Sequence, residues 1–140
     1  MAISKASAKW TGTLKEGAGS MKGGSGFFDA PFTFLSRFEG AQTGTNPEEL
    51  IGAAQAGCFS MFLAAQLTTA GHPPTSIETT ATVELGAGPA ITKISLVTNA
   101  VVPGVSKETF DEKVKFSKEN CPISKALGGV PEITIDAKLG

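Results

Sequence analysis

The 140 residues, 41% of them hydrophobic, are enough for one compact domain, and no break in composition divides them, so we expect a single domain over residues 1–140. The 12 basic and 13 acidic residues give a net charge of -1 and are interspersed along the chain, which argues against nucleic acid as a partner. The first residues, Met1 to Lys5, lack the apolar core of a secretory signal, so a cytoplasmic location is predicted.

The N-terminal third is predicted to be a β-meander. Residues 9–14 alternate polar with apolar side chains, residues 17–26 are rich in turn formers, and the aromatic segment 27–38 is expected to form a further strand. The glycines lead into strands and match neither the G-x-G-x-x-G fingerprint nor the phosphate-loop pattern. We interpret them as hairpin turns.

A long helix is predicted from Asn46 to about Ala70. Asn46 can cap it, Pro47 suits its first position, and Glu49 completes a capping-box-like arrangement. At about 1.5 Å per residue the helix would be about 37 Å long. Its centre, residues 51–63, is apolar or small around nearly the whole circumference, so we expect it to be buried on all sides.

A second subunit is the favoured way to bury this helix. One layer of sheet covers only one face of a helix, and few elements remain in so short a chain to cover the other. Small residues would also let another backbone come close, which favours a homodimer over an unusually wrapped monomer. These residues are Gly52, Ala53, Ala54, Ala56 and Gly57.

A membrane span is the alternative explanation for the apolar helix. Its strongly apolar part, residues 50–67, is interrupted by Gln55, Ser60 and Gln66. A span needs about 20 mostly apolar residues, so we predict a buried helix and no membrane partner.

The remaining chain predicts further strands and helices. Residues 77–85 and 91–102 alternate as an antiparallel hairpin, and residues 133–139 form a closing strand with one wet face. Ser106 can cap a charged helix over residues 107–119, with Phe110 and Val114 on its buried side, and a short helical turn begins at Cys121. The fold class is therefore α+β, with antiparallel sheets around a long central helix that carries Cys58.

The only two cysteines, Cys58 and Cys121, are ordinarily interpreted as small buried hydrophobes in a reducing compartment. Two separated cysteines without companion histidines do not supply the ligands of a structural zinc site, so no metal is predicted. A cysteine hydrolase is the rival enzyme class. Its histidine would have to be His72, which lies about four helical turns or about 21 Å beyond Cys58 at about 1.5 Å per residue. If the cysteines act, they act as thiols.

A reactive Cys58 needs a cation, because apolar surroundings alone raise a thiol pKa. Arg37, the only arginine, precedes the long helix and is the candidate to stabilise a thiolate. A buried arginine in turn needs a carboxylate. Glu48 points about 100° away from the capping Glu49 and is free to pair with Arg37, although a surface acid that complements the helix dipole fits the spacing equally well.

Cys121 directly precedes Pro122 at a helix start. Unpaired backbone N–H groups and the helix dipole stabilise a thiolate there, which suits a resolving thiol. A buried cysteine with a chance proline neighbour fits the same sequence, and the spacing does not establish that Cys121 reaches Cys58.

Four segments of the sequence resemble the osmotically inducible protein C (OsmC) family. They are RFEG at 37–40, GTNPEELIGAA at 44–54, AGCFSM at 56–61 and NCPIS at 120–124. The similarity covers essentially the whole chain. The position of Arg37 directly before the helix looks like this branch rather than the sister organic hydroperoxide resistance branch, and Gln55 stands where several relatives carry a ring residue.

The resemblance implies an intertwined homodimer with two sites at its interface and peroxidase activity towards organic hydroperoxides and hydrogen peroxide. By motif position Cys58 is the peroxidatic thiol, Cys121 the resolving thiol, Arg37 the thiolate-stabilising cation and Glu48 the acid that holds it. The expected cycle passes through a Cys58 sulfenic acid and a Cys58–Cys121 disulfide, which an external dithiol reduces without a bound cofactor. The alternative is a non-enzymatic dimer that binds a small apolar ligand between its central helices.

Overall fold

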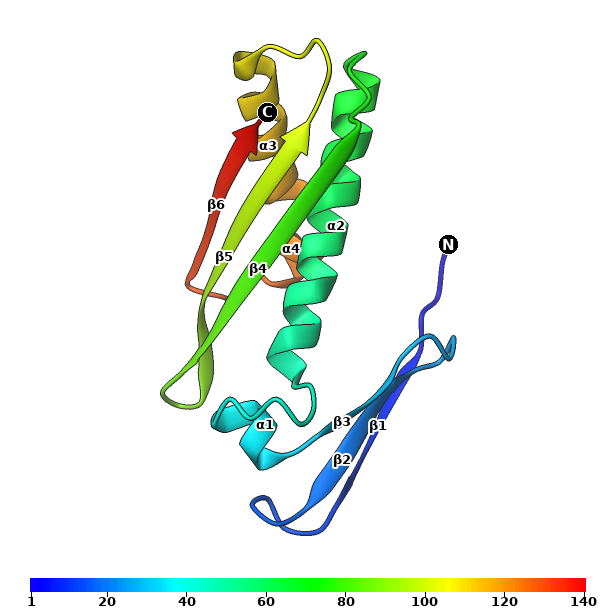
Figure 1. Ribbon diagram of the computed structural model, residues 1–140, viewed down its shortest axis with the longest axis vertical. Helices are drawn as coiled ribbons and strands as arrows, with labels where there is room; N and C mark the ends of the chain where they lie inside the picture. The colour runs from blue at the N-terminus through cyan, green and yellow to red at the C-terminus, as the bar shows by residue number, and fades with distance from the viewer. The chain divides into compact units, whose positions relative to one another are not determined.

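The computed structural model describes residues 1–140, which form two compact units over residues 1–50 and 51–140 (Figure 1). Strands and helices are present in both units, so the predicted α+β class is confirmed. The single domain over residues 1–140 stays a prediction.

The first unit contains a three-stranded antiparallel sheet in the order β1-β2-β3. Its strands are β1 (Ala6–Thr11), β2 (Ala18–Gly23) and β3 (Asp29–Phe32). The predicted meander is present, but β2 lies where only turns were expected. Gly19 explains both the strand and its weak signal, because a Cβ there would lie 2.7 Å from ring atoms of Trp10 and Phe32. The glycine lets these two rings pack over the strand with their centroids 5.2 Å apart.

The sequence predicted one strand over the aromatic segment, but this prediction is wrong. The segment breaks into β3 and the short helix α1 (Phe34–Phe38). Thr33 caps α1 by accepting from the Ser36 N–H at 3.1 Å, and the Ser36 hydroxyl accepts from the Thr33 N–H at 2.9 Å. This reciprocal pair is a capping box, and it overrides the strand preference of the flanking phenylalanines.

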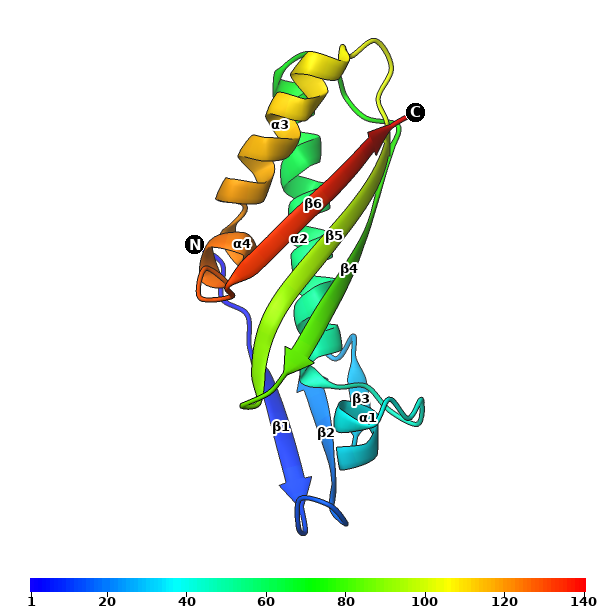
Figure 2. The same ribbon diagram turned by 90° about the vertical axis from the view of Figure 1, so that its left-hand side faces the viewer.

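The second unit contains the sheet β4-β5-β6, with helices packed on it (Figure 2). Its strands are β4 (Ser76–Gly86), β5 (Ala90–Val101) and β6 (Glu132–Leu139), and its shorter helices are α3 (Lys107–Asn120) and α4 (Pro122–Ala126). The hairpin β4–β5 is antiparallel as predicted, but β6 pairs with β5 in parallel. The sheet is therefore mixed rather than antiparallel. The cause is the crossover through α3 and α4, which returns the chain to the same end of the sheet.

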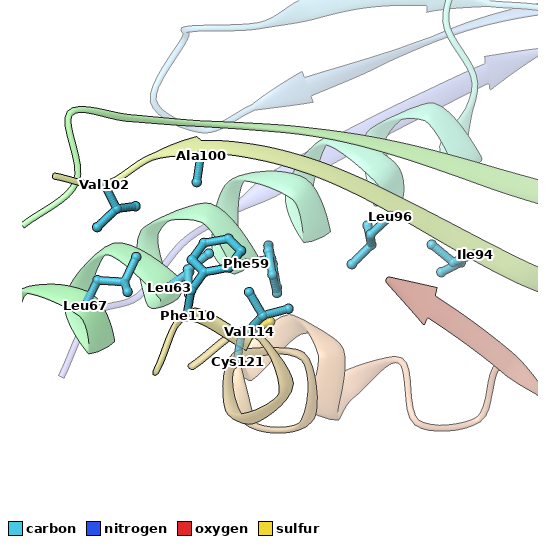
Figure 3. Packing of buried hydrophobic residues seen from close by; sticks show 10 residues of the cluster. All are labelled: Phe59, Leu63, Leu67, Ile94, Leu96, Ala100, Val102, Phe110, Val114 and Cys121. Atoms are coloured by element: carbon cyan, nitrogen blue, oxygen red, sulfur yellow. The ribbon is translucent and has the colours of Figure 1, made fainter. Parts of the chain in front are cut away.

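The long helix α2 (Pro47–Thr69) begins in the first unit and continues through the second, close to its predicted bounds. Three of its side chains, Phe59, Leu63 and Leu67, have no solvent exposure. Figure 3 shows them meeting buried side chains of β5 and α3, including Leu96 and Phe110. This core fixes the face of α2 that carries Cys58 against β5 and α3.

The opposite face of α2 is exposed in the single chain, so one chain alone does not bury the helix on all sides. Between residues 51 and 67 its exposed residues are Ala53, Ala54, Gly57, Met61 and Ala65, and Met61 retains 78% of its reference exposure. Cover by a second subunit stays a prediction.

By length and composition α2 qualifies as a candidate membrane span, since an 18-residue window reaches a mean hydropathy of 1.5. The argument that its apolar part is too short is therefore wrong. Core helices of soluble proteins meet the same criterion, and 28% of that window is buried in the single chain.

Candidate active site

Arg37 and Glu48 form the ion pair that the sequence left open. Arg37 lies in α1 and Glu48 in the first turn of α2. The guanidinium donates through Nη2 to Glu48 Oε1 at 2.8 Å and through Nε to the same oxygen at 3.1 Å. The Glu48 side chain is 8% exposed and the Arg37 side chain 35%. The pair thus joins a buried acid to a half-exposed base.

Two further contacts define the surroundings of the Arg37 guanidinium. Its carbon lies 5.2 Å from the centroid of the Phe38 ring, a cation–π distance. The second carboxylate oxygen of Glu48, Oε2, is buried without a hydrogen-bond partner. Arg37 is therefore held from one side by a carboxylate and from another by an aromatic ring.

Glu49 has a structural role, but not the one that the capping pattern predicted. The Asn46 side chain caps α2 by accepting from the Glu49 N–H at 2.7 Å. The Glu49 carboxylate accepts from the Thr45 hydroxyl at 2.7 Å, so the reciprocal half of the expected capping box is replaced. Thr45, directly before the cap, supplies a hydroxyl donor within reach of the carboxylate. The Asn46 amide also donates to the Ser36 carbonyl at 3.1 Å, which ties α1 to the start of α2.

The fold brings the two cysteines together, which the sequence spacing could not establish. Cys58 lies within α2 and is half-buried, whereas Cys121 is the fully buried N-cap of α4. Both are free thiols, and Cys58 packs against the buried cluster that contains Cys121. The start of α4 therefore supplies the second thiol.

Burial raises the pKa of the Cys58 thiol above its ordinary value. The neighbouring Cys121 raises this pKa further, and the Ile123 backbone hydrogen bond is the only influence that lowers it. These local contacts leave Cys58 mostly protonated at neutral pH. A reactive thiolate at this position needs an additional positive charge.

Two polar residues complete the surroundings of Cys121. Gln55, one turn before Cys58, is completely buried and donates through Nε2 to the Ser124 hydroxyl oxygen at 3.2 Å. The same oxygen accepts from the Cys121 thiol at 2.9 Å. Sequence reasoning assigned neither residue a role. The available signals were a polar residue inside the apolar helix and a serine at the third position of a helix capped by cysteine.

The remaining ionisable groups do not assemble a metal centre, since no group of three or more His, Cys, Asp or Glu residues is placed to hold an ion. His72 follows the end of α2, where its backbone N–H donates to the Leu67 carbonyl at 2.8 Å. The chemistry available around Cys58 is therefore that of two adjacent thiols.

Solved structures share the fold of this chain. An OsmC-like protein from Mycoplasma pneumoniae superposes with a TM-score of 0.75 at 16% identity, over 99% of this chain and 97% of that one. An organic hydroperoxide resistance protein OsmC from Legionella pneumophila superposes with a TM-score of 0.71 at 22% identity, over 100% and 99% of the two chains.

The sequence comparisons identify the family. The model of OsmC-like proteins matches residues 40–136. Peroxiredoxin OsmC of Escherichia coli is 49% identical to this chain over 139 residues, which cover 96% of this chain and 95% of the relative. The Shigella flexneri protein of the same name matches equally well. The chain therefore belongs to the OsmC-like protein family and is a cysteine-based peroxidase.

Proposed function

We propose that the chain reduces organic hydroperoxides and hydrogen peroxide through the Cys58 thiol, with Cys121 as the resolving thiol. The observation that carries this proposal is the packing of Cys58 against the buried cluster that contains Cys121, the N-cap of α4. Two thiols in one cluster can close a disulfide with little movement of the backbone.

The Cys58 thiolate attacks the distal oxygen of the hydroperoxide, the O–O bond breaks, and the alcohol leaves after taking a proton. Cys58 is then a sulfenic acid. The Cys121 sulfur attacks the Cys58 sulfur, the S–O bond breaks, and the hydroxyl leaves as water with the Cys121 proton. An external dithiol then reduces the disulfide and is itself oxidised to a disulfide.

Exposure assigns the two thiols different parts in this cycle. Cys58 is half-buried, whereas Cys121 has no exposure. Only Cys58 is open to a peroxide from solvent. The same difference directs the external dithiol to the Cys58 sulfur.

Arg37 is proposed to supply the positive charge that Cys58 lacks locally. The guanidinium keeps its charge even where it is desolvated, and Glu48 fixes its orientation through Oε1. A cation near a thiol favours the thiolate and so opposes the upward shift of the Cys58 pKa that burial causes.

An apolar cavity beside Arg37 supports organic hydroperoxides as substrates. The cavity measures about 230 Å³, and its lining residues are Trp10, Leu14, Phe32, Thr33, Phe34, Arg37 and Phe38. Its rings suit a hydrocarbon group, while the guanidinium can donate to the peroxide oxygens. We propose that this cavity receives the organic part of the substrate.

We place this activity in the cytoplasm, where dithiol reductants are kept reduced, with neither nucleic acid nor a membrane as partner. The near-neutral charge of the chain supports the first exclusion. The packing of α2 on β5 and α3 supports the second.

The proposed disulfide is tested by intact mass after one equivalent of cumene hydroperoxide. The mass is expected to fall by two hydrogen atoms per chain with no oxygen retained, and dithiothreitol should restore the starting mass. A chain that gains oxygen permanently at Cys58 would contradict the role of Cys121. An unchanged mass would favour the non-enzymatic dimer that binds a small apolar ligand.

A homodimer is expected to persist at micromolar concentration, because the exposed face of α2 is apolar and made mostly of small residues. Sedimentation equilibrium measures the mass directly. A species at twice the 14.3 kDa chain mass is expected. The variant Met61→Glu should shift the equilibrium towards monomer, since it places a charge on this face. A wild-type monomer at micromolar concentration would contradict the dimer and any site at its interface.

A further inference from the structure

Gln55, Ser124 and Cys121 form a buried chain of hydrogen bonds in the second unit. The Cys121 thiol donates to Ser124 Oγ at 2.9 Å, and Gln55 Nε2 donates to the same oxygen at 3.2 Å. The Ser124 backbone N–H donates to the Cys121 sulfur at 3.4 Å. Gln55 is completely buried and Ser124 is 7% exposed, so water does not compete freely for these groups.

Ser124 Oγ accepts two hydrogens, while Gln55 Oε1 is buried without a partner. Buried polar atoms are normally paired, so the unpaired Oε1 shows that the amide faces Ser124 with its N–H donor rather than its oxygen. Loss of the Cys121 proton frees one of the two positions on Ser124 Oγ. The Ser124 hydroxyl can then turn its hydrogen towards the sulfur while Gln55 Nε2 continues to donate to Oγ.

In that state every donated hydrogen in this series of hydrogen bonds points towards Cys121. The amide donates to the hydroxyl, the hydroxyl donates to the thiolate, and the Ser124 N–H donates to the same sulfur. Hydrogen bonds to the charged form of a group stabilise it, and bonds in series strengthen one another. The Gln55 amide is thus oriented for the thiolate before the thiolate forms.

We propose that Gln55 and Ser124 are positioning residues that stabilise Cys121 as a thiolate during disulfide formation and disulfide reduction. The inference rests on the proposed disulfide chemistry and adds to it the residues that control the resolving thiol. Neither residue touches the peroxide. Both act through the Cys121 sulfur.

The proposal assigns a direction to the reductive step. The external dithiol loses a proton, and its thiolate attacks the half-buried Cys58 sulfur. The S–S bond breaks, and its electron pair leaves on the Cys121 sulfur. The Ser124 hydroxyl and N–H stabilise the negative charge there by donating to that sulfur. The second thiol of the reductant then displaces Cys58, the reductant ends as a disulfide, and its two protons end on the two cysteines. A better stabilised leaving thiolate makes the first of these steps faster.

Ser124→Ala and Gln55→Met test the proposal. Alanine removes the hydroxyl and keeps the backbone N–H, and methionine replaces the amide by an apolar side chain of similar length. Oxidation of Cys58 by peroxide should proceed at the wild-type rate within a factor of about two. Disulfide formation should slow by about tenfold in Ser124→Ala and less in Gln55→Met, and its pH profile should move to higher pH. Quenched-flow mass spectrometry with dimedone separates the two steps by counting trapped sulfenic acid.

Ser117→Ala is the matched control, because Ser117 is completely buried and its hydroxyl has no partner. It removes a buried hydroxyl outside the chain of hydrogen bonds and should leave both rates unchanged. Thermal melts confirm that the variants are folded. Equal slowing of both steps, or unchanged disulfide formation in both test variants, would overturn the inference. Absence of a disulfide in the wild-type protein would instead overturn the proposed function.

Discussion

Cys58→Ser is expected to abolish peroxide consumption altogether. The chain has only one other thiol, and Cys121 is completely buried. A serine hydroxyl is not ionised at neutral pH and does not replace a thiolate as nucleophile. Peroxide consumption with a dithiol reductant, measured by loss of cumene hydroperoxide, should fall to the rate of the reductant alone.

Cys121→Ser is the matched variant, because it removes the second sulfur and keeps the first. One equivalent of peroxide should still be consumed rapidly, leaving a Cys58 sulfenic acid that dimedone traps and that excess peroxide carries to the sulfinic state. Steady turnover with a dithiol at the wild-type rate would show that Cys121 does not resolve the intermediate. Residual activity in Cys58→Ser, lost on adding Cys121→Ser, would show that the two thiols have been assigned in reverse.

The helices other than α1 and most strands of the fold could be predicted because their signals are local. Asn46 and Pro47 mark the start of α2, and Ser106 caps α3 by accepting from the Thr109 N–H at 3.1 Å. Alternation along β4 and β6 gives each strand one half-buried and one exposed face. Such patterns depend on neighbours three or four residues away at most, so the sequence alone contains them.

The errors arise where contacts between distant residues decide the structure. Gly19 makes β2 a poor strand by propensity, yet the rings of Trp10 and Phe32 cover it. The parallel pairing of β6 depends on the crossover through α3 and α4, which no strand pattern encodes. The capping box of Thr33 and Ser36 was a local signal that the aromatic residues around it concealed.

In the candidate site, too, some contacts could be predicted from the sequence and others could not. Arg37 and Glu48 could be proposed as a pair because a lone arginine near two acids leaves few choices, and the structure contains that ion pair. The packing of Cys58 against the cluster that contains Cys121 brings together residues from α2 and α4, which sequence spacing does not reveal. Ser124 and Gln55 were not given a role because serine and glutamine are common and the hydrogen bond between them joins positions far apart in the chain.

Glu48→Ala is expected to lower the rate of Cys58 oxidation by at least about tenfold at neutral pH, equivalent to about 1.4 kcal/mol. Without Glu48 the half-exposed Arg37 loses both hydrogen bonds from its guanidinium and can turn to solvent. Burial already raises the Cys58 pKa. Under the proposed role of Arg37, loss of this cation raises the pKa further. Since the thiolate is the reactive form, the rate should rise with pH in both proteins, and the midpoint of that rise should lie higher in Glu48→Ala.

Glu49→Ala is the matched control, because it removes the adjacent carboxylate and leaves the ion pair in place. Alanine keeps the backbone N–H that Asn46 caps, so only the bond from the Thr45 hydroxyl is lost. The free energy of unfolding should fall by about 1 kcal/mol, the usual contribution of one hydrogen bond, while the oxidation rate stays near that of the wild type. Glu49→Gln should recover the stability, since its amide oxygen can accept from Thr45. Stopped-flow oxidation across pH and thermal melts separate the two acids. Equal rate losses in the two alanine variants, or a slower Glu49→Ala enzyme, would show that the carboxylates have been assigned the wrong way round.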